Sequence, residues 1–190
     1  MKNVDILEML ERANALLKGH FLLSSGLHSE QYLQCALLLR YPAYAEELCK
    51  RLAEKFKYGK IDLVVGPAYG GIIVAHELAR ALGVRAVFTE RKDGKMQLRR
   101  GFHIEEGEHI LIAEDVITTG KSVKEVIAAV KPYKPKIIGI ATLIDRSTKT
   151  KLFGKICMET LKKIKIKTYT HQRCPMCKAK KALVKHGSRG

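Results

Sequence analysis

The sequence lacks the features that would place the chain in a membrane, in the secretory pathway or among disordered proteins. No apolar run approaches the roughly 18 residues that a membrane-spanning helix needs. The N-terminus, MKNVDILEML, carries acidic residues where a signal peptide needs basic ones. Only 15 glycines and 5 prolines occur among 190 residues, which excludes a collagen-like or low-complexity chain. We therefore expect a soluble, cytoplasmic protein, and 46% hydrophobic residues suffice for a folded core.

Cysteines are few and odd in number, which argues against a secreted disulfide framework. The five are Cys35, Cys49, Cys157, Cys174 and Cys177. The first three stand singly in apolar surroundings, so we expect buried thiols there.

The last two cysteines form a Cys174-x-x-Cys177 pair, which has the spacing of half a zinc site. His171 or Cys157 could contribute further ligands. Because no second pair of this kind occurs in the chain, we favour reduced thiols or a redox pair over zinc.

Acidic residues are scarce in the last quarter of the chain. Residues 146–190 hold 14 Lys and Arg but one acidic residue, Glu159, so this stretch carries +13 of the total of +16. Such a basic surface attracts nucleic acid or polyphosphate. It is equally typical of a solvated surface in a lysine-rich protein. Composition alone leaves both interpretations open.

Helical spacing dominates the first 60 residues. Apolar side chains between Val4 and Leu17 recur every three or four positions, and Gly19 ends the pattern. Residues 21–32 are turn-rich, and Pro42 opens a second helix with apolar side chains on one face. We predict that this segment forms a mostly helical cap.

From residue 61 the pattern changes to that of an α/β domain. Short, continuous apolar runs predict parallel strands buried on both faces, at 61–66, 84–90, 109–115 and 136–145. Helical stretches separate them near 71–82 and 119–131, and the alternating run 164–170 predicts an edge strand. The predicted organisation is a cap at 1–60, an α/β core with a parallel sheet flanked by helices at 61–170, and a basic tail at 171–190. Open sheets of this kind bind ligands at their carboxyl edge.

The segment HILIAEDVITTGKSVKEVIAAV, residues 109–130, combines a buried strand, two acids, a hydroxyl-rich loop and a helix. Free amides at the helix start, 118–122, can bind a phosphate, and Gly120 allows close approach of the backbone. The hydroxyls of Thr118, Thr119 and Ser122 can add donors. The adjacent Glu114 and Asp115 would repel a phosphate, but they can accept hydrogen bonds from ribose hydroxyls. The segment therefore predicts a site for a 5-phosphoribosyl group.

The letters TGKS within this segment look like the end of a P-loop. The P-loop pattern, however, requires a glycine where this chain has Asp115. We therefore do not expect a nucleoside triphosphatase.

The run EDVITTGKS, 114–122, resembles the phosphoribosyl-diphosphate (PRPP) motif of type I phosphoribosyltransferases. Three further segments resemble the orotate-specific branch of that family: HFLLSSGLHSEQYLQ at 20–34, GPAYGGIIVAHELA at 66–79 and ATLIDRS at 141–147. The likeness covers roughly residues 15–150. It implies transfer of phosphoribose from PRPP to orotate with Mg²⁺, giving orotidine 5′-phosphate and diphosphate in pyrimidine synthesis.

The resemblance also implies roles for single residues. The PRPP site would comprise the whole motif: Glu114, Asp115, Val116, Ile117, Thr118, Thr119, Gly120, Lys121 and Ser122. Arg146 would bind the carboxylate of orotate, Thr118 would also contact the base, and the turn containing Ala68 and Tyr69 would face the diphosphate.

The polar segment 90–104 would close over PRPP as a lid, often in the neighbouring subunit's site, which implies a homodimer. Arg91, Lys92 and Lys95 are its candidates for contacting diphosphate oxygens. We expect the bound PRPP to hold most of the Mg²⁺ coordination, with no metal ligand certain from the protein.

Two alternatives stay open at this point. One is the same reaction with a purine base as acceptor. The other is a PRPP-sensing regulator that binds nucleic acid through the basic tail, although the first 60 residues show no basic helix-turn-helix. We expect small-molecule substrates, no membrane and no nucleic-acid partner.

Overall fold

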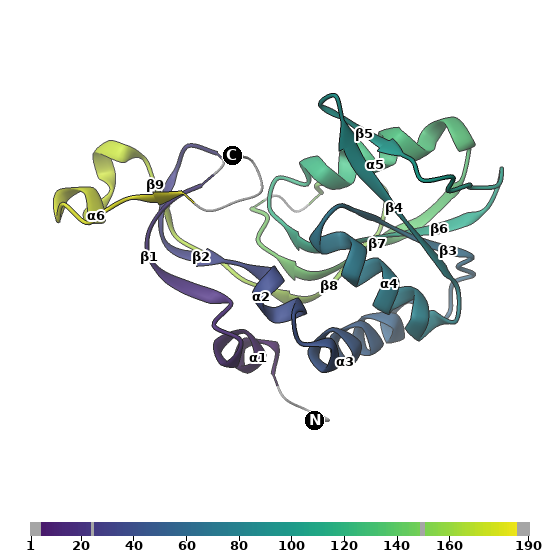
Figure 1. Ribbon diagram of the computed structural model, residues 1–190, viewed down its shortest axis with the longest axis horizontal. Coiled ribbons are helices and arrows are strands. Elements are labelled where there is room, and N and C mark those ends of the chain that lie inside the picture. Colours follow the sequence, from purple (N-terminus) through teal and green to yellow (C-terminus); the bar gives the residue numbers. More distant parts are fainter. Residues whose placement is uncertain (1–4, 24, 149–150, 186–190) are drawn as a thin grey trace.

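A six-stranded sheet forms the centre of the computed structural model, which describes residues 5–23, 25–148 and 151–185 (Figure 1). Its strand order is β5-β4-β3-β6-β7-β8. The strands are β3 (Leu63–Pro67), β4 (Arg85–Lys92), β5 (Lys95–Leu98), β6 (His109–Ile117), β7 (Lys136–Asp145) and β8 (Met158–Lys163). All pairs are parallel except β4 with β5. The four strands predicted from continuous apolar runs are confirmed.

Helices cover both faces of this sheet, which is why its strands lack alternation. Val64 and Leu111 point into one hydrophobic cluster with α3 (Pro42–Ala53) and α4 (Gly70–Leu82). Their neighbours Val65 and Ile112 point into a second cluster with α5 (Lys121–Val130). Successive strand residues are thus buried against different helices, as a parallel sheet with two covered faces requires.

The N-terminal segment contains helices, as its spacing predicts, but also a β-hairpin that the spacing does not predict. Helix α1 (Ile6–Arg12) is followed by a hairpin of β1 (Leu16–Leu22) and β2 (His28–Leu33). The predicted helix stops early because Asn14 has a left-handed φ of 51°, a conformation that asparagine tolerates. The turn-rich stretch 21–32 therefore supplies strands. After α2 (Cys35–Leu39), α3 packs on α4 as part of the core rather than above it.

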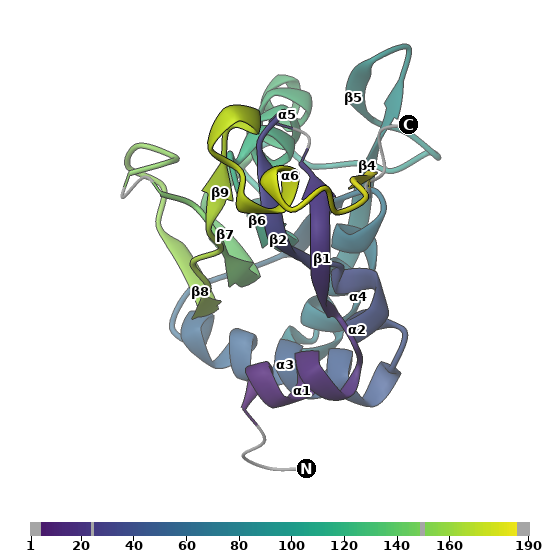
Figure 2. The same cartoon turned by 90° about the vertical axis from the view of Figure 1, so that its left-hand side faces the viewer.

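The C-terminal segment returns to the hairpin. The edge strand predicted at 164–170 is wrong, because β8 occupies that edge of the central sheet. Only β9 (Thr168–Tyr169) forms from the predicted run, and it pairs with β2 in a second sheet of order β10-β1-β2-β9. Its edge strand β10 (Val184–Lys185) follows η3 (His171–Arg173) and α6 (Pro175–Lys178), and Figure 2 shows α6 beside this sheet. The last five residues of the predicted tail lie outside the described part of the chain.

The described helices are all short. The longest, α4, has 13 residues, and within the described ranges no helix has the length and apolar character that crossing a bilayer requires.

Candidate active site

Two acidic side chains mark the carboxyl end of the central sheet. Glu114 and Asp115 lie in β6, which continues to Ile117. Glu114 Oε1 accepts a hydrogen bond from the Asp115 amide at 3.2 Å, and Asp115 Oδ1 accepts one from the Val116 amide at 2.7 Å. The Thr142 hydroxyl donates to the carbonyl of Asp115 at 3.3 Å. These contacts hold both carboxylates at the sheet edge.

Burial sets the electrostatics of this acid pair. Glu114 is only 7% exposed, and loss of solvent, reinforced by the neighbouring Asp115, raises its pKa well above the usual range. Loss of solvent also raises the pKa of Asp115. A ligand that brings hydroxyl donors or a cation would stabilise the charged form of these two carboxylates.

The predicted phosphate cradle follows directly after β6. Thr118 and Thr119 are exposed, and Gly120 stands at the N-cap of α5 with a left-handed φ of 69°. No side chain caps this helix, although the Lys121 amide lies 3.4 Å from the Thr119 hydroxyl. The first turn of α5 therefore presents amides and a positive helix end to an incoming anion.

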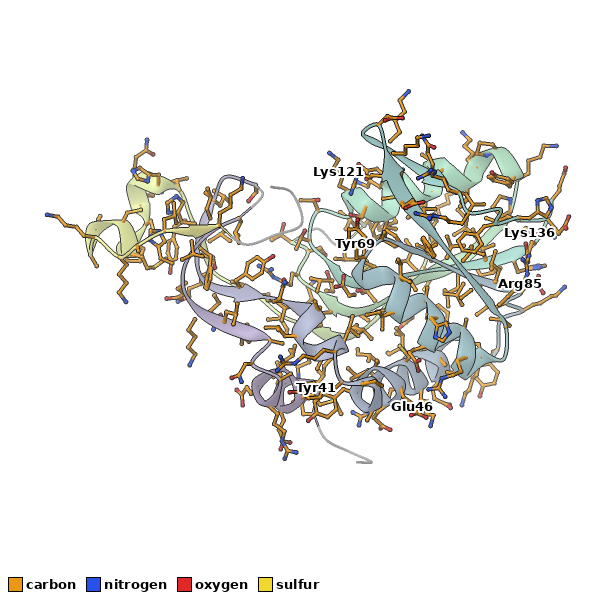
Figure 3. The ribbon with its side chains drawn as sticks, viewed as in Figure 1. Tyr41, Glu46, Tyr69, Arg85, Lys121 and Lys136 are labelled. Atoms are coloured by element: carbon orange, nitrogen blue, oxygen red, sulfur yellow. The ribbon has the colours of Figure 1, made fainter. Side chains whose placement is uncertain are left out.

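A second turn faces the same edge between β3 and α4. A Cβ at Gly70 would lie 2.2 Å from Asp115 Oδ2, and one at Gly71 would lie 2.6 Å from the Pro67 ring. Only glycine can therefore occupy these positions while the turn packs against the acid pair. Tyr69 is 81% exposed at the start of α4, and Figure 3 shows it toward the same end of the sheet as Lys121 of α5. The Ala68 amide bonds the Thr89 carbonyl at 2.7 Å, so Ala68 is anchored to β4.

Arg146 follows β7 at this edge and is the least satisfied cation there. Its amide donates to the Ile117 carbonyl at 2.7 Å, which ties it to the end of β6. Its Nε is buried and has no hydrogen-bond partner among the residues that the structure describes. Burial lowers its pKa. It is not paired with Asp145, which instead accepts from the Ser147 amide at 2.7 Å and lies 3.3 Å from Lys163 Nζ.

Two residues from the N-terminal segment complete the surroundings of Arg146. Tyr32 in β2 and Cys35 in α2 are its electrostatic neighbours. Burial raises the pKa of Cys35 well above its usual range, with Asp115 and Glu114 adding to the rise and Arg146 opposing it. The hairpin and α2 thus reach over the site. The likeness of segment 20–34 to the orotate-specific branch includes Tyr32, but no local spacing places Tyr32 and Cys35 beside Arg146, because the pairing of the hairpin decides it.

The basic segment 90–104 is an ordered arm rather than a loop. Strands β4 and β5 pair up to the tip, where Lys92 opposes Lys95. The connecting Asp93 and Gly94 both have left-handed φ angles, of 52° and 75°, as a tight hairpin turn requires. The arm projects from the body beside α5 (Figure 1).

The three candidate cations of this arm differ in position. Arg91 forms an ion pair with Glu125 of α5 and also lowers the pKa of Glu114. Lys92 and Lys95 are exposed at the tip. The structure thus places Arg91 near the acid pair and the two lysines away from it.

A family model of known proteins covers the part of the chain that holds this site. The phosphoribosyl transferase domain family matches residues 38–176, which include both turns, the acid pair and Arg146. The chain belongs to the phosphoribosyltransferase family.

Relatives within the family point to one branch. An orotate phosphoribosyltransferase of Caldanaerobacter subterraneus subsp. tengcongensis is 52% identical over 100% of this chain and 99% of its own length. One from Caldicellulosiruptor saccharolyticus is also 52% identical, over 100% of this chain and 98% of its own. The crystal structure of orotate phosphoribosyltransferase from Aeropyrum pernix superposes with a TM-score of 0.70 at 22% identity, covering 83% of this chain and 92% of that one. The fold expected from sequence, a phosphoribosyltransferase-type parallel sheet, is confirmed.

Proposed function

We propose that this phosphoribosyltransferase uses orotate as its acceptor and forms orotidine 5′-phosphate and diphosphate from orotate and PRPP. The observation that carries the proposal is Arg146, a half-buried residue whose guanidinium Nε is buried and unpartnered among the described residues, at the edge that holds the acid pair. A planar guanidinium binds a carboxylate with two parallel hydrogen bonds, and orotate is a base that carries one. The full-length relatives named for this activity support the same acceptor.

PRPP would bind along the edge between the two turns. Its 5-phosphate fits the first turn of α5, where no side chain caps the free amides. Its ribose hydroxyls would donate to Glu114 and Asp115, and the turn at Ala68 and Tyr69 would lie toward the diphosphate.

The acid pair also fits the magnesium ion that the family uses. Mg²⁺ is usually bound by one or two carboxylates together with substrate phosphates, and Glu114 and Asp115 supply two carboxylates of raised pKa beside the PRPP site. When bound, the ion would neutralise the diphosphate leaving group.

Positioning and electrostatics are the protein's contribution to the reaction. The bond between the anomeric carbon and diphosphate breaks as a ring nitrogen of orotate bonds to that carbon, and positive charge develops on the ribose. The proton of that nitrogen leaves to solvent or to the diphosphate. Arg146 and Thr118 would hold the base in line, while the carboxylates at 114 and 115 face the developing charge. Tyr32 and Cys35 would help to exclude water from the base.

Steady-state kinetics with different acceptors test the proposal. Turnover of PRPP with orotate, and none with adenine or xanthine, is the expected result. Turnover with a purine in place of orotate would assign the chain to the alternative acceptor class.

We further propose a homodimer in which the β4–β5 arm of one subunit reaches the partner's PRPP site. The support is the position of Lys92 and Lys95, which are exposed at the tip of an arm that projects from its own body. We place the enzyme in the cytoplasm, since Cys35, Cys49 and Cys157 are free thiols, as a reducing compartment would keep them.

A further inference from the structure

A cluster of four metal-ligating side chains lies outside the substrate site, where the C-terminal segment meets the hairpin. It consists of His20, His28, Cys174 and Cys177. His20 comes from β1 and His28 from β2, while Cys174 is the N-cap of α6 and Cys177 lies within it. One nitrogen or sulfur atom from each residue lies within 4.8 Å of all the others. Figure 2 shows α6 in front of β1 and β2, so segments about 150 residues apart in the chain converge here.

Three sulfur-to-nitrogen distances in the cluster match the edges of a metal tetrahedron. Cys174 Sγ and Cys177 Sγ lie 3.5 and 3.6 Å from His20 Nε2, and Cys177 Sγ lies 3.3 Å from His28 Nδ1. Zinc bonds of about 2.3 Å to sulfur and about 2.0 Å to nitrogen give tetrahedral sulfur-to-nitrogen edges of about 3.5 Å. The two histidine nitrogens are 2.7 Å apart. They would have to separate by about half an ångström to reach a tetrahedral edge.

A hydrogen bond fixes the tautomer of the His20 ring. Its other ring nitrogen, Nδ1, lies 2.9 Å from the carbonyl oxygen of Lys181, which can only accept a hydrogen bond. Nδ1 therefore carries the proton, and Nε2 presents its lone pair to the cluster. Metal-ligating histidines commonly use their second nitrogen in this way.

The backbone of β1 is shaped at the same point. The register between β1 and β2 shifts between Lys18 and Phe21, so one extra residue is inserted where His20 stands. A bulge of this kind re-aims a side chain. Both His20 and His28 are 4% exposed, and Cys174 is fully buried. Two imidazoles and a thiol are thus held together away from water, where a metal ion would satisfy their lone pairs.

The second sheet has little else to hold it together. Strands β9 and β10 have two residues each. Phe21, Cys174 and Met176 are buried there but belong to neither of the two hydrophobic clusters of the molecule. Small units without a core of their own are commonly stabilised by a structural metal.

We propose that His20, His28, Cys174 and Cys177 bind one zinc ion that fastens the C-terminal segment to the hairpin. Two thiolates and two imidazoles in a tetrahedron are a donor set for zinc. Four protein ligands leave no open position, so the site is structural. This ligand set replaces the partners considered from spacing alone. Cys157 is exposed and lies beside Glu159. His171 Nδ1 is 3.5 Å from Cys177 Sγ, but the residue is exposed and outside the four.

Metal analysis of the full chain, purified without chelator from zinc-supplemented cells, tests the proposal. About one zinc per chain is expected. Cys174→Ser and Cys177→Ser should each lose most of it, whereas Cys157→Ser, the matched control, and His171→Ala should retain it. Chelation under conditions that strip the metal should lower the Tm of the wild-type protein by several degrees and leave that of Cys177→Ser unchanged.

Cobalt substitution of the wild-type chain keeps the test valid if the cysteine variants fail to fold. Co²⁺ in this donor set should give the intense visible bands of a tetrahedral site and a thiolate charge-transfer band. Three results would each overturn the proposal: wild-type protein without zinc and without these bands, zinc retained in both serine variants, or a Cys174–Cys177 disulfide in freshly purified protein. Loss of zinc in His171→Ala would overturn the ligand set. None of these results depends on the acceptor base.

Discussion

At the scale of residues, the site gathers charged groups that the fold has removed from water. Burial raises the pKa of Glu114 and lowers that of Arg146, so each group loses hydration that favours its charged form. Neither compensates the other directly, since Arg146 Nε has no partner among the described residues. A substrate that offers a carboxylate to one group and hydroxyls to the other would satisfy both.

Arg146 should therefore control the use of orotate. A charge-assisted hydrogen bond contributes about 1.5–3 kcal/mol, so Arg146→Ala should raise the KM for orotate at least about tenfold. The KM for PRPP should change little, and Arg146→Lys should rescue only part of the loss because a point charge cannot replace the planar fork. Kinetics with each substrate varied in turn measure this, with the exposed Arg12→Ala as control. Equal weakening of both substrates would show that Arg146 is a structural residue.

The ionisation of Glu114 should make the stability of the folded protein depend on pH. Because its pKa is raised in the folded state, the folded protein binds more protons than the unfolded chain between the ordinary and the raised pKa, so stability falls as pH rises through that window. Glu114→Gln keeps an oxygen for the Asp115 amide but cannot ionise. We expect it to be more stable than wild type by about 0.5–2 kcal/mol at pH 8, with the difference vanishing near pH 4 and with turnover lost. Urea unfolding across this pH range measures it. A variant less stable than wild type at pH 8 would contradict the assignment.

At the scale of elements, the site is built from the ends of strands and the starts of helices. The turn after β3 packs on Asp115 through Gly70, and the turn after β6 leads through Gly120 into α5. Both helices begin without a side-chain cap. Their free amides are thus available to the two anionic groups of PRPP.

Gly120 offers a test of this arrangement with a matched control. A Cβ there would need a left-handed φ of 69° and would lie 2.7 Å from the Phe153 ring. Gly83, at the C-cap of α4, has a φ of 71° with open space around it. Gly83→Ala should lose about 1 kcal/mol of stability from the left-handed φ alone, and Gly120→Ala should lose more, because the Phe153 ring must also shift. Only Gly120→Ala should raise the KM for PRPP, by about tenfold or more. Denaturation and kinetics on both variants check this. An unchanged KM for PRPP in Gly120→Ala would contradict binding of the 5-phosphate at this turn.

At the scale of the whole molecule, two extensions leave the α/β core. One is the β4–β5 arm beside α5, and the other is the second sheet, in which the C-terminal segment closes on the hairpin. The hairpin also carries Tyr32 toward Arg146, so the proposed zinc site and the base site share one structural support.

If the β4–β5 arm of one subunit completes the PRPP site of the other, two inactive variants should complement each other in a mixed dimer. We expect Asp115→Asn to be nearly inactive, and Lys92→Ala with Lys95→Ala to be strongly impaired. Mixing the two under conditions that exchange subunits should restore part of the activity, because a hybrid dimer holds one intact combination of arm and acid pair. Activity assays measure the restored turnover, and light scattering measures the mass of the oligomer. A fully active monomer would contradict the shared lid.

Much of the fold and the centre of the site follow from local sequence. The four buried strands, the helices after 70 and 120 and the acid pair at a strand end come from consecutive residues, whose burial on two faces leaves an unbroken apolar run. The hairpin at 16–33 was not predictable in this way, because its strands include polar side chains that only pairing buries, such as His28 and Ser29. Cys157 likewise follows local apolarity in sequence but is exposed in the structure.

What the sequence determined by itself is the motif at 109–130, since one strand, one turn and one helix place its acids and amides together without help from the rest of the chain. Only the tertiary structure decided which distant residues join it. Tyr32 and Cys35 meet Arg146, and His20 and His28 meet the Cys174-x-x-Cys177 pair, through pairing of β2 with β1 and β9. Such contacts depend on strand register over separations of more than 100 residues, and no local spacing encodes them.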